Sequence, residues 1–248
     1  MDCINQSFGR QETEFTCEAG RPDSITEEKL RVLYENNVGR ISINPQTMND
    51  PTLKRIGRAH DSGQVTESFS LTRSIGFNNI NMDIILGLPG ETMVQLFHTL
   101  EEIKKLDPES VTVHTLALKR ASVYNENYIK GSLPDDEIVS RMMEYTKGFL
   151  RDMGMHPYYL YRQKHMAQNL ENIGFSKEGF ECIYNMQIIE ERQTIVAFGA
   201  DAVTKVVING ENRIERQHNI KDLKLYIENI EAMISRKLDI LDQILYGE

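Results

Sequence analysis

Short apolar runs alternate with amphipathic helical patterns over the first half of the chain. Strand-like runs are expected at residues 14–18, 40–44, 80–86 and 111–118. The segments between these runs carry apolar residues at helical spacing, with Leu96, Leu100 and Ile103 in the clearest stripe. Strands joined by helices must run parallel to one another. The pattern therefore predicts an α/β fold with a mainly parallel sheet, either open or closed into a barrel.

Start and stop signals support these helices. Ser24 and Glu27 have the spacing of a capping box, as do Thr92 and Gln95. Other helix ends are marked by Asp50 as an N-cap before Pro51, and by Gly76 as a stop.

The second half has a different pattern. One long helix is expected at residues 135–153, and short strands at 158–162, 183–188, 194–198, 203–208 and 213–217. A closing helix is expected at 221–237, with an apolar face that includes Leu223, Ile227 and Ile234. We expect a first domain over residues 1–163 and a small α+β domain over residues 164–248.

Residues 80–92 contain the most informative local pattern. A buried strand carries Asp83 in its middle and runs through the turn Gly87-Leu88-Pro89-Gly90 into a helix. Enzymes with α/β folds place their chemistry where such strands end. Asp83 is therefore the first candidate site residue.

Polar residues alternate with apolar ones along all four strands. They are Thr16 and Glu18, Ser42 and Asn44, Asn81 and Asp83, and Thr112 and His114. If these faces point the same way, they line a polar cavity. Burying an unpaired carboxylate costs several kcal/mol, so Glu18 and Asp83 need solvent, a cation or a ligand with donors.

Structural explanations remain open for single residues. Glu18 would also suit a cap for the following turn, Asp83 a pair with Arg58, and His114 a satisfied position in the core. The other histidines have no metal-ligand spacing. The chain also contains no nucleophile elbow and no phosphate-binding loop.

Composition narrows the class of protein. The chain has 248 residues, a net charge of −9 and 40% hydrophobic residues. The acidic surface disfavours nucleic acid and anionic membranes as partners, and no apolar run is long enough to cross a bilayer. Cys3, Cys17 and Cys182 form neither a disulfide pattern nor a zinc motif, which suits a reducing compartment. We expect a cytoplasmic protein.

Several collinear segments resemble the oxygen-independent coproporphyrinogen III oxidases of the radical S-adenosylmethionine (SAM) family, most closely the coproporphyrinogen dehydrogenase branch. The segments are TCEAGRPDS at 16–24, RISINPQTMND at 40–50, GRAH at 57–60, DIILGLP at 83–89, VTVHTLAL at 111–118, QNLENIG at 168–174 and FGA at 198–200. Together they extend over most of the chain.

This resemblance implies a fold, a reaction and a site. The fold would be an incomplete radical-SAM-type (βα) barrel followed by the small α+β domain. In the family, a 4Fe–4S cluster cleaves SAM to a deoxyadenosyl radical. The radical converts two propionates of coproporphyrinogen III to vinyl groups with loss of CO2, giving protoporphyrinogen IX in haem biosynthesis. The resemblance assigns SAM binding to the side chains of Glu18, Gln46, Arg58 and Asp83 and to the backbone of Ala117.

The chain departs from the family in its cluster motif. It contains neither C-x3-C-x2-C nor the Gly-Gly-Thr-Pro segment that contacts SAM, so no metal ligand is assigned. We expect a C-terminal portion of the family protein, inactive by itself, whose substrate is a porphyrinogen. No electron donor is identified. Exposed strand edges left by missing barrel units would favour a dimer through that edge.

Two rival functions remain. One is the haem chaperone of the same family, which carries His-Asn-x-x-Tyr-Trp where this chain has QNLENI at 168–173 and contains no tryptophan. The other is a non-radical barrel enzyme that uses Asp83 and His114 as acid and base.

Overall fold

A computed structural model of the chain describes Gln6 and residues 14–116, 134–162, 171–208 and 213–246. The chain forms two compact units, Met1–Cys182 and Ile183–Glu248. The expected boundary between residues 163 and 164 lies inside the first unit, because strand β6 (Asn172–Ser176) belongs to the sheet of that unit.

The first unit is built on a six-stranded sheet with the order β1-β2-β3-β4-β6-β5. The other strands are β1 (Thr16–Gly20), β2 (Arg40–Ile43), β3 (Ile80–Leu86), β4 (Ser110–Thr115) and β5 (His156–Tyr161). Strands β1 to β4 run parallel, as the sequence predicts. β6 is antiparallel to both β4 and β5. The result is an open sheet, as expected for an incomplete barrel.

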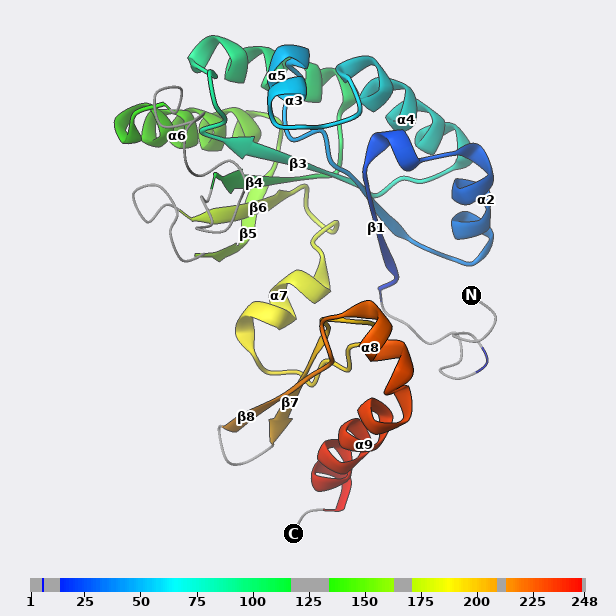
Figure 1. The fold of residues 1–248 in the computed structure, drawn as a ribbon. Helices are drawn as coiled ribbons and strands as arrows, with labels where there is room; N and C mark the ends of the chain where they lie inside the picture. Colours follow the sequence, from blue (N-terminus) through cyan, green and yellow to red (C-terminus); the bar gives the residue numbers. More distant parts are fainter. Residues whose placement is uncertain (1–5, 7–13, 117–133, 163–170, 209–212, 247–248) are drawn as a thin grey trace. The chain divides into compact units, whose positions relative to one another are not determined.

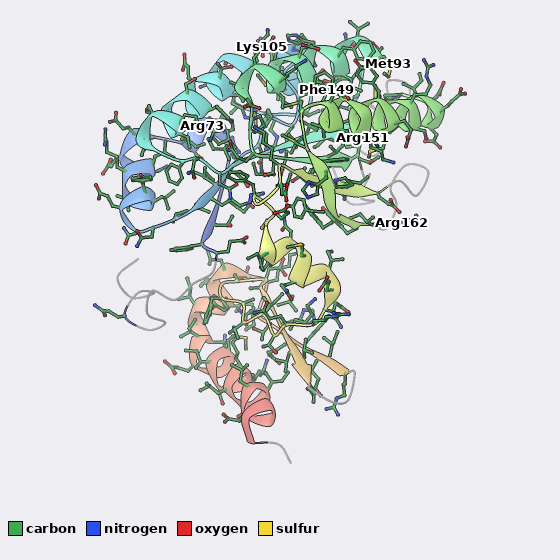
Figure 2. The ribbon with its side chains drawn as sticks, turned by 180° about the vertical axis from the view of Figure 1, so that it is seen from behind. Arg73, Met93, Lys105, Phe149, Arg151 and Arg162 are labelled. Atoms are coloured by element: carbon green, nitrogen blue, oxygen red, sulfur yellow. The ribbon has the colours of Figure 1, made fainter. Side chains whose placement is uncertain are left out.

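Helices cover one face of this sheet (Figure 1). They are η1 (Pro22–Ser24), α2 (Glu27–Glu35), α3 (Asp50–Arg55), α4 (Ser62–Ile75), α5 (Met93–Leu106) and α6 (Asp136–Asp152). Figure 2 labels Arg73, Met93, Lys105 and Phe149 in this helical layer. The buried strand residues beneath it are Ile41, Ile43, Ile80, Met82, Ile84, Leu86, Val111 and Val113. Most apolar residues of β2, β3 and β4 thus face the helices, and the polar residues lie on the opposite face together with Ile85.

Helix ends follow the sequence signals with two changes. The Thr92 capping box of α5 is confirmed, since the Thr92 N–H donates to Gln95 Oε1 at 3.0 Å. Thr26 caps α2 in place of Ser24, and Asn49 takes the N-cap position of α3 in place of Asp50. Ser24 is the last residue of η1 and lies two residues before Thr26, the residue that directly precedes α2.

Two predicted strands are wrong. Residues 183–188 belong to helix α7 (Ile183–Glu190), and residues 194–198 form only one bridge, between Ile195 and Lys205. Short apolar runs do not distinguish a strand from a helix. The sequence pattern also missed β6, which is entirely buried and includes Gly174.

The second unit contains α7, the antiparallel hairpin of β7 (Val203–Ile208) and β8 (Arg213–His218), and helices α8 (Leu223–Glu228) and α9 (Ile230–Tyr246). The predicted closing helix is thus divided at Asn229. Its predicted apolar face is also wrong, since Leu223, Ile227 and Ile234 are exposed, and the buried residues of α9 are Met233, Lys237 and Ile240.

β1 lies at one edge of the sheet, and among the described strands it pairs only with β2. The dimer expected through this edge stays a prediction. Within the described residues, no helix combines the length and the hydropathy needed to span a membrane.

Candidate functional site

The polar residues of neighbouring strands lie side by side on the face opposite the helices. Ser42 is paired with Asn81, Asp83 with Thr112, and Ile85 with His114. Paired residues of parallel strands project to the same side of a sheet. The sequence prediction of one shared polar face is therefore confirmed.

Asn81 organises this face. It is buried, and its side-chain amide donates to Asp83 Oδ1 at 2.7 Å and to Ser42 Oγ at 3.4 Å. Its carbonyl oxygen accepts from the hydroxyls of Ser110 at 3.1 Å and Thr112 at 3.2 Å. The side-chain amide of Asn81 thus forms hydrogen bonds with residues of β2, β3 and β4. These bonds fix the orientation of the Asp83 carboxylate.

The second oxygen of Asp83 lies against His114. Asp83 Oδ2 is 3.5 Å from His114 Nε2, and the two side chains remain 18% and 25% exposed. Asp83 is thus held by one amide while its other oxygen remains accessible. It can accept hydrogen bonds from a ligand that reaches the polar face.

Gln46 lies beside Asp83 because of its unusual backbone. Its φ is 67°, in the left-handed region. Its N–H donates to the Asp83 carbonyl at 2.9 Å, and its own carbonyl accepts from the Ile85 N–H at 2.9 Å. These two bonds join the loop after β2 to β3, next to the carboxyl end of that strand.

A pocket of about 280 Å³ opens at this position. It is lined by Gln46, Asp83, Ile85, His114, Thr115, Leu116 and Asn172. The Asn172 side chain accepts from the Thr115 N–H at 2.9 Å, which ties β6 to the end of β4. The pocket therefore lies at the carboxyl ends of β3 and β4, where α/β folds bind ligands.

Glu18 lies on the same polar face and is exposed. The protein around its carboxylate excludes part of the solvent, and the negative charge of Asp83 adds to this effect, so the pKa of Glu18 is raised. A hydrogen bond with Ser42 and the charges of Arg40 and His114 act in the opposite direction. A cationic or hydrogen-bond-donating ligand would relieve the repulsion between the two carboxylates.

Tyr159 closes the polar face on its β5 side. It is opposite Gly174 in the register, where an added Cβ would lie 1.8 Å from Tyr159 Cε1. Its phenol forms a hydrogen bond with Thr112, although burial is the larger effect and raises its pKa. Tyr159 lies on β5, which is an edge strand of the sheet.

The structure brings together only some of the predicted site residues. Gln46 and Asp83 line one pocket, and Glu18 is near enough for Asp83 to influence its pKa. Arg58 is half-buried and is not a lining residue, and among the described residues no ion pair joins it to Asp83. Ala117 lies outside the described residues, although its neighbour Leu116 lines the pocket.

Three polar lining residues, His114, Thr115 and Asn172, were not assigned to the site from the sequence. His114 was an open alternative, indicated by its alternation with Thr112 and by its place in the family segment at 111–118. Asn172 was missed because the strand that carries it was not predicted.

The donor set does not fit an iron–sulfur cluster. No group of three or more metal-ligating side chains occurs in the described part of the chain. Burial and the adjacent Glu18 raise the pKa of the Cys17 thiol, and Cys182 is buried with its sulfur donating to Glu14. Asp83 and Gln46 in the pocket instead offer oxygen acceptors, which suit hydroxyl and ammonium groups of a ligand.

Three comparisons with known proteins agree with this fold. Residues 3–103 match the radical SAM superfamily. The chain is 48% identical to the oxygen-independent coproporphyrinogen-III oxidase-like protein HemZ of Bacillus subtilis (strain 168), over 93% of this chain and 46% of that protein. It is 32% identical to the heme chaperone HemW of the same organism, over 93% of this chain and 56% of that protein.

Among solved structures, the coproporphyrinogen III oxidase HemN of Escherichia coli, described as a radical SAM enzyme, matches with a TM-score of 0.67 at 19% identity. The match covers 89% of this chain and 49% of that one. The chain thus spans about half the length of the relatives that it matches. Residues 3–103 of the chain thus resemble the radical SAM superfamily, and the chain as a whole is similar to the oxygen-independent coproporphyrinogen-III oxidase-like protein of that comparison.

Proposed function

We propose that this chain supplies the SAM-binding sheet of a protein that oxidatively decarboxylates coproporphyrinogen III to protoporphyrinogen IX. The observation that carries the proposal is the pocket that joins Gln46, Asp83 and His114 at the carboxyl ends of two parallel strands. The 48% identity to the HemZ protein supports the choice of reaction.

The pocket residues suit the polar groups of SAM. The accessible oxygen of Asp83 accepts from ribose hydroxyls or from the ammonium group, and Gln46 adds an amide that both donates and accepts. Glu18 supplies a second carboxylate on the same face. The family resemblance assigns the SAM carboxylate to Arg58, which does not line the pocket. SAM, when bound, supplies the adenosyl group that this superfamily converts to a radical.

The described residues do not provide the ligands of the iron–sulfur cluster. Because the described cysteines do not form a ligand set, the proposal assigns this chain the binding and orientation of SAM and no redox step. Any porphyrinogen reaction requires cluster ligands that this sequence does not contain.

The similarity to HemW favours haem transfer as a second candidate function. The two candidates differ in their ligands. The decarboxylase needs SAM and a porphyrin with four carboxylates, whereas the chaperone needs haem iron and an iron ligand.

Three titrations of the purified 248-residue chain separate the candidates. SAM binding is followed by NMR of its 13C-labelled methyl group, coproporphyrin III binding by fluorescence, and haem binding by the Soret band. We expect SAM and coproporphyrin III to bind weakly and the Soret band of haem to remain that of the free compound. A shifted Soret band at one haem per chain, with no SAM binding, would instead establish the chaperone function.

A further inference from the structure

Glu91 lies at the centre of a buried polar cluster that the proposed SAM site does not use. The residue follows the Gly-Leu-Pro-Gly turn directly and is only 6% exposed. Thr47 donates to Glu91 Oε1 at 2.6 Å, and the Asn49 side-chain amide donates to the same oxygen at 3.2 Å. Burial raises the pKa of Glu91, while these hydrogen bonds, one with Thr52 and the charge of Arg55 oppose the shift.

The cluster joins the loop after β2 to helix α5. Asn49 Nδ2 also lies 3.1 Å from the Gln95 carbonyl and 3.0 Å from Thr99 Oγ1, so its two hydrogens are shared among the surrounding acceptors. Thr99 Oγ1 accepts from the Met48 N–H at 3.1 Å. The loop is therefore held at three consecutive residues, Thr47, Met48 and Asn49.

The turn itself is held by Arg55 of α3. Its guanidinium donates to the Pro89 carbonyl at 2.6 Å. It also occupies the space over Gly90, where an added Cβ would lie 1.9 Å from the arginine Nη1. Gly90 has a φ of 76°, a left-handed conformation that favours glycine.

Gln46 immediately precedes Thr47, which the hydrogen bond to Glu91 holds in place. A non-glycine residue in the left-handed region costs about 1 kcal/mol or more and persists only where its surroundings impose it. Here the surroundings are the bonds to β3 on one side of Gln46 and the Glu91 cluster on the other. Glu91 is not among the residues that line the pocket, so its effect on a ligand must pass through Thr47 and Gln46.

We propose that Glu91 is a positioning residue: through Thr47 it holds Gln46 in the left-handed conformation that places it beside Asp83 for ligand binding. The inference rests on the proposed SAM site for its ligand. The effect of the Glu91–Thr47 hydrogen bond on the conformation of Gln46 can be tested without any ligand.

Thr47→Val is the main test because it removes the hydroxyl and keeps the shape of the side chain. Thr146→Val is the matched control, since Thr146 is also fully buried and its hydroxyl bonds to the Met142 carbonyl within α6. Thr47→Ser restores the hydroxyl, and Glu91→Gln keeps an acceptor at residue 91. All four variants are compared with the wild-type chain.

Amide hydrogen exchange at Gln46 and Ile85 reports directly on how firmly the loop is held, because these amides make the two hydrogen bonds between the loop and β3. In Thr47→Val we expect their exchange to rise about 10-fold, the order that loss of a bond to a charged acceptor produces. Thr146→Val and Thr47→Ser should leave it unchanged, and Glu91→Gln should give a smaller rise. Unchanged exchange in Thr47→Val would overturn the proposal.

SAM affinity provides the functional readout. It should fall about 10-fold in Thr47→Val and recover in Thr47→Ser. A wild-type chain that does not bind SAM would refute the proposed function, yet the exchange result would still decide the role of Glu91. Faster exchange with unchanged SAM affinity would limit Glu91 to a structural role and would refute this inference.

Discussion

Asp83 Oδ2 lies 3.5 Å from His114 Nε2, and the two residues come from adjacent parallel strands. The other oxygen of Asp83 accepts from the buried Asn81 amide. One carboxylate is thus fixed by the sheet on one side and open to a pocket on the other. Each of the following predictions tests a part of this arrangement.

Asn81→Ala should lower the free energy of unfolding by about 2 kcal/mol, because the Ser110 and Thr112 hydroxyls would lose their buried acceptor. Urea denaturation measures the change. Asn78→Ala is the control, since Asn78 is an exposed asparagine in the loop before β3 and should change stability by less than about 0.5 kcal/mol. Equal losses in the two variants would show that Asn81 does not organise the polar face.

Gly174→Ala should be destabilising by about 2 kcal/mol, because the new methyl group would overlap the Tyr159 ring. In a Tyr159→Ala background the same change should cost much less, and a double-mutant cycle measures this coupling. Gly148→Ala in α6 is the control. Nothing lies within 4 Å of its added Cβ, so it should increase stability by about 0.5–1 kcal/mol. Additive costs at Gly174 and Tyr159 would contradict the packing described.

Glu18→Gln should stabilise the fold at pH 7. The raised pKa means that folding favours the neutral carboxyl of Glu18. Ionisation of Glu18 therefore lowers the stability of the fold once the pH rises above the ordinary pKa of glutamate. Glu18 is exposed, and solvent screening limits the gain to about 0.3 kcal/mol, or about 1 °C in Tm. The difference in Tm should shrink as the pH falls through the ordinary glutamate pKa and vanish at about pH 3, where wild-type Glu18 is protonated in both states. A gain that persists at about pH 3 would exclude charge as its cause.

Anaerobic reconstitution with iron and sulfide should leave the chain without a stoichiometric iron–sulfur cluster. Fe–S clusters are held by sets of thiolates, whereas this chain has three cysteines with no cluster spacing, and the Cys17 thiol has a raised pKa. Iron and acid-labile sulfide analysis after gel filtration measures the outcome. One 4Fe–4S cluster per chain would show that the ligand assignment is wrong.

The strand pattern singled out Asp83 and the family resemblance singled out Gln46, because both signals are local properties of the chain. The structure places these two residues in one pocket, and their role in binding SAM stays a prediction. The shared polar face followed from alternation in four strands, and the register confirms it. The left-handed conformation of Gln46 was not predicted, because it depends on bonds to Asp83 and Ile85, which are distant in sequence.

The errors have similar causes. β6 has only five residues with Gly174 in its centre, so the alternation of Ile173 and Phe175 is too short to predict a strand, and its pairing with β4 and β5 makes it one. Residues 183–188 have the isoleucine and tyrosine content of a strand but form a helix, since intrinsic β-propensity is a weak guide. The polar cluster around Glu91 could not be predicted from the sequence, because it joins residues more than 40 positions apart.

The SAM affinity of Asp83→Asn relative to wild type tests the central claim most directly, with Glu101→Gln as the control for loss of an exposed carboxylate. Both substitutions remove one negative charge, but only Asp83 lines the pocket. NMR titration with 13C-methyl SAM should show at least about a 10-fold loss of affinity in Asp83→Asn, as expected when a charged acceptor is lost, and no change in Glu101→Gln. Equal affinities for all three proteins would contradict the assignment of this pocket to SAM.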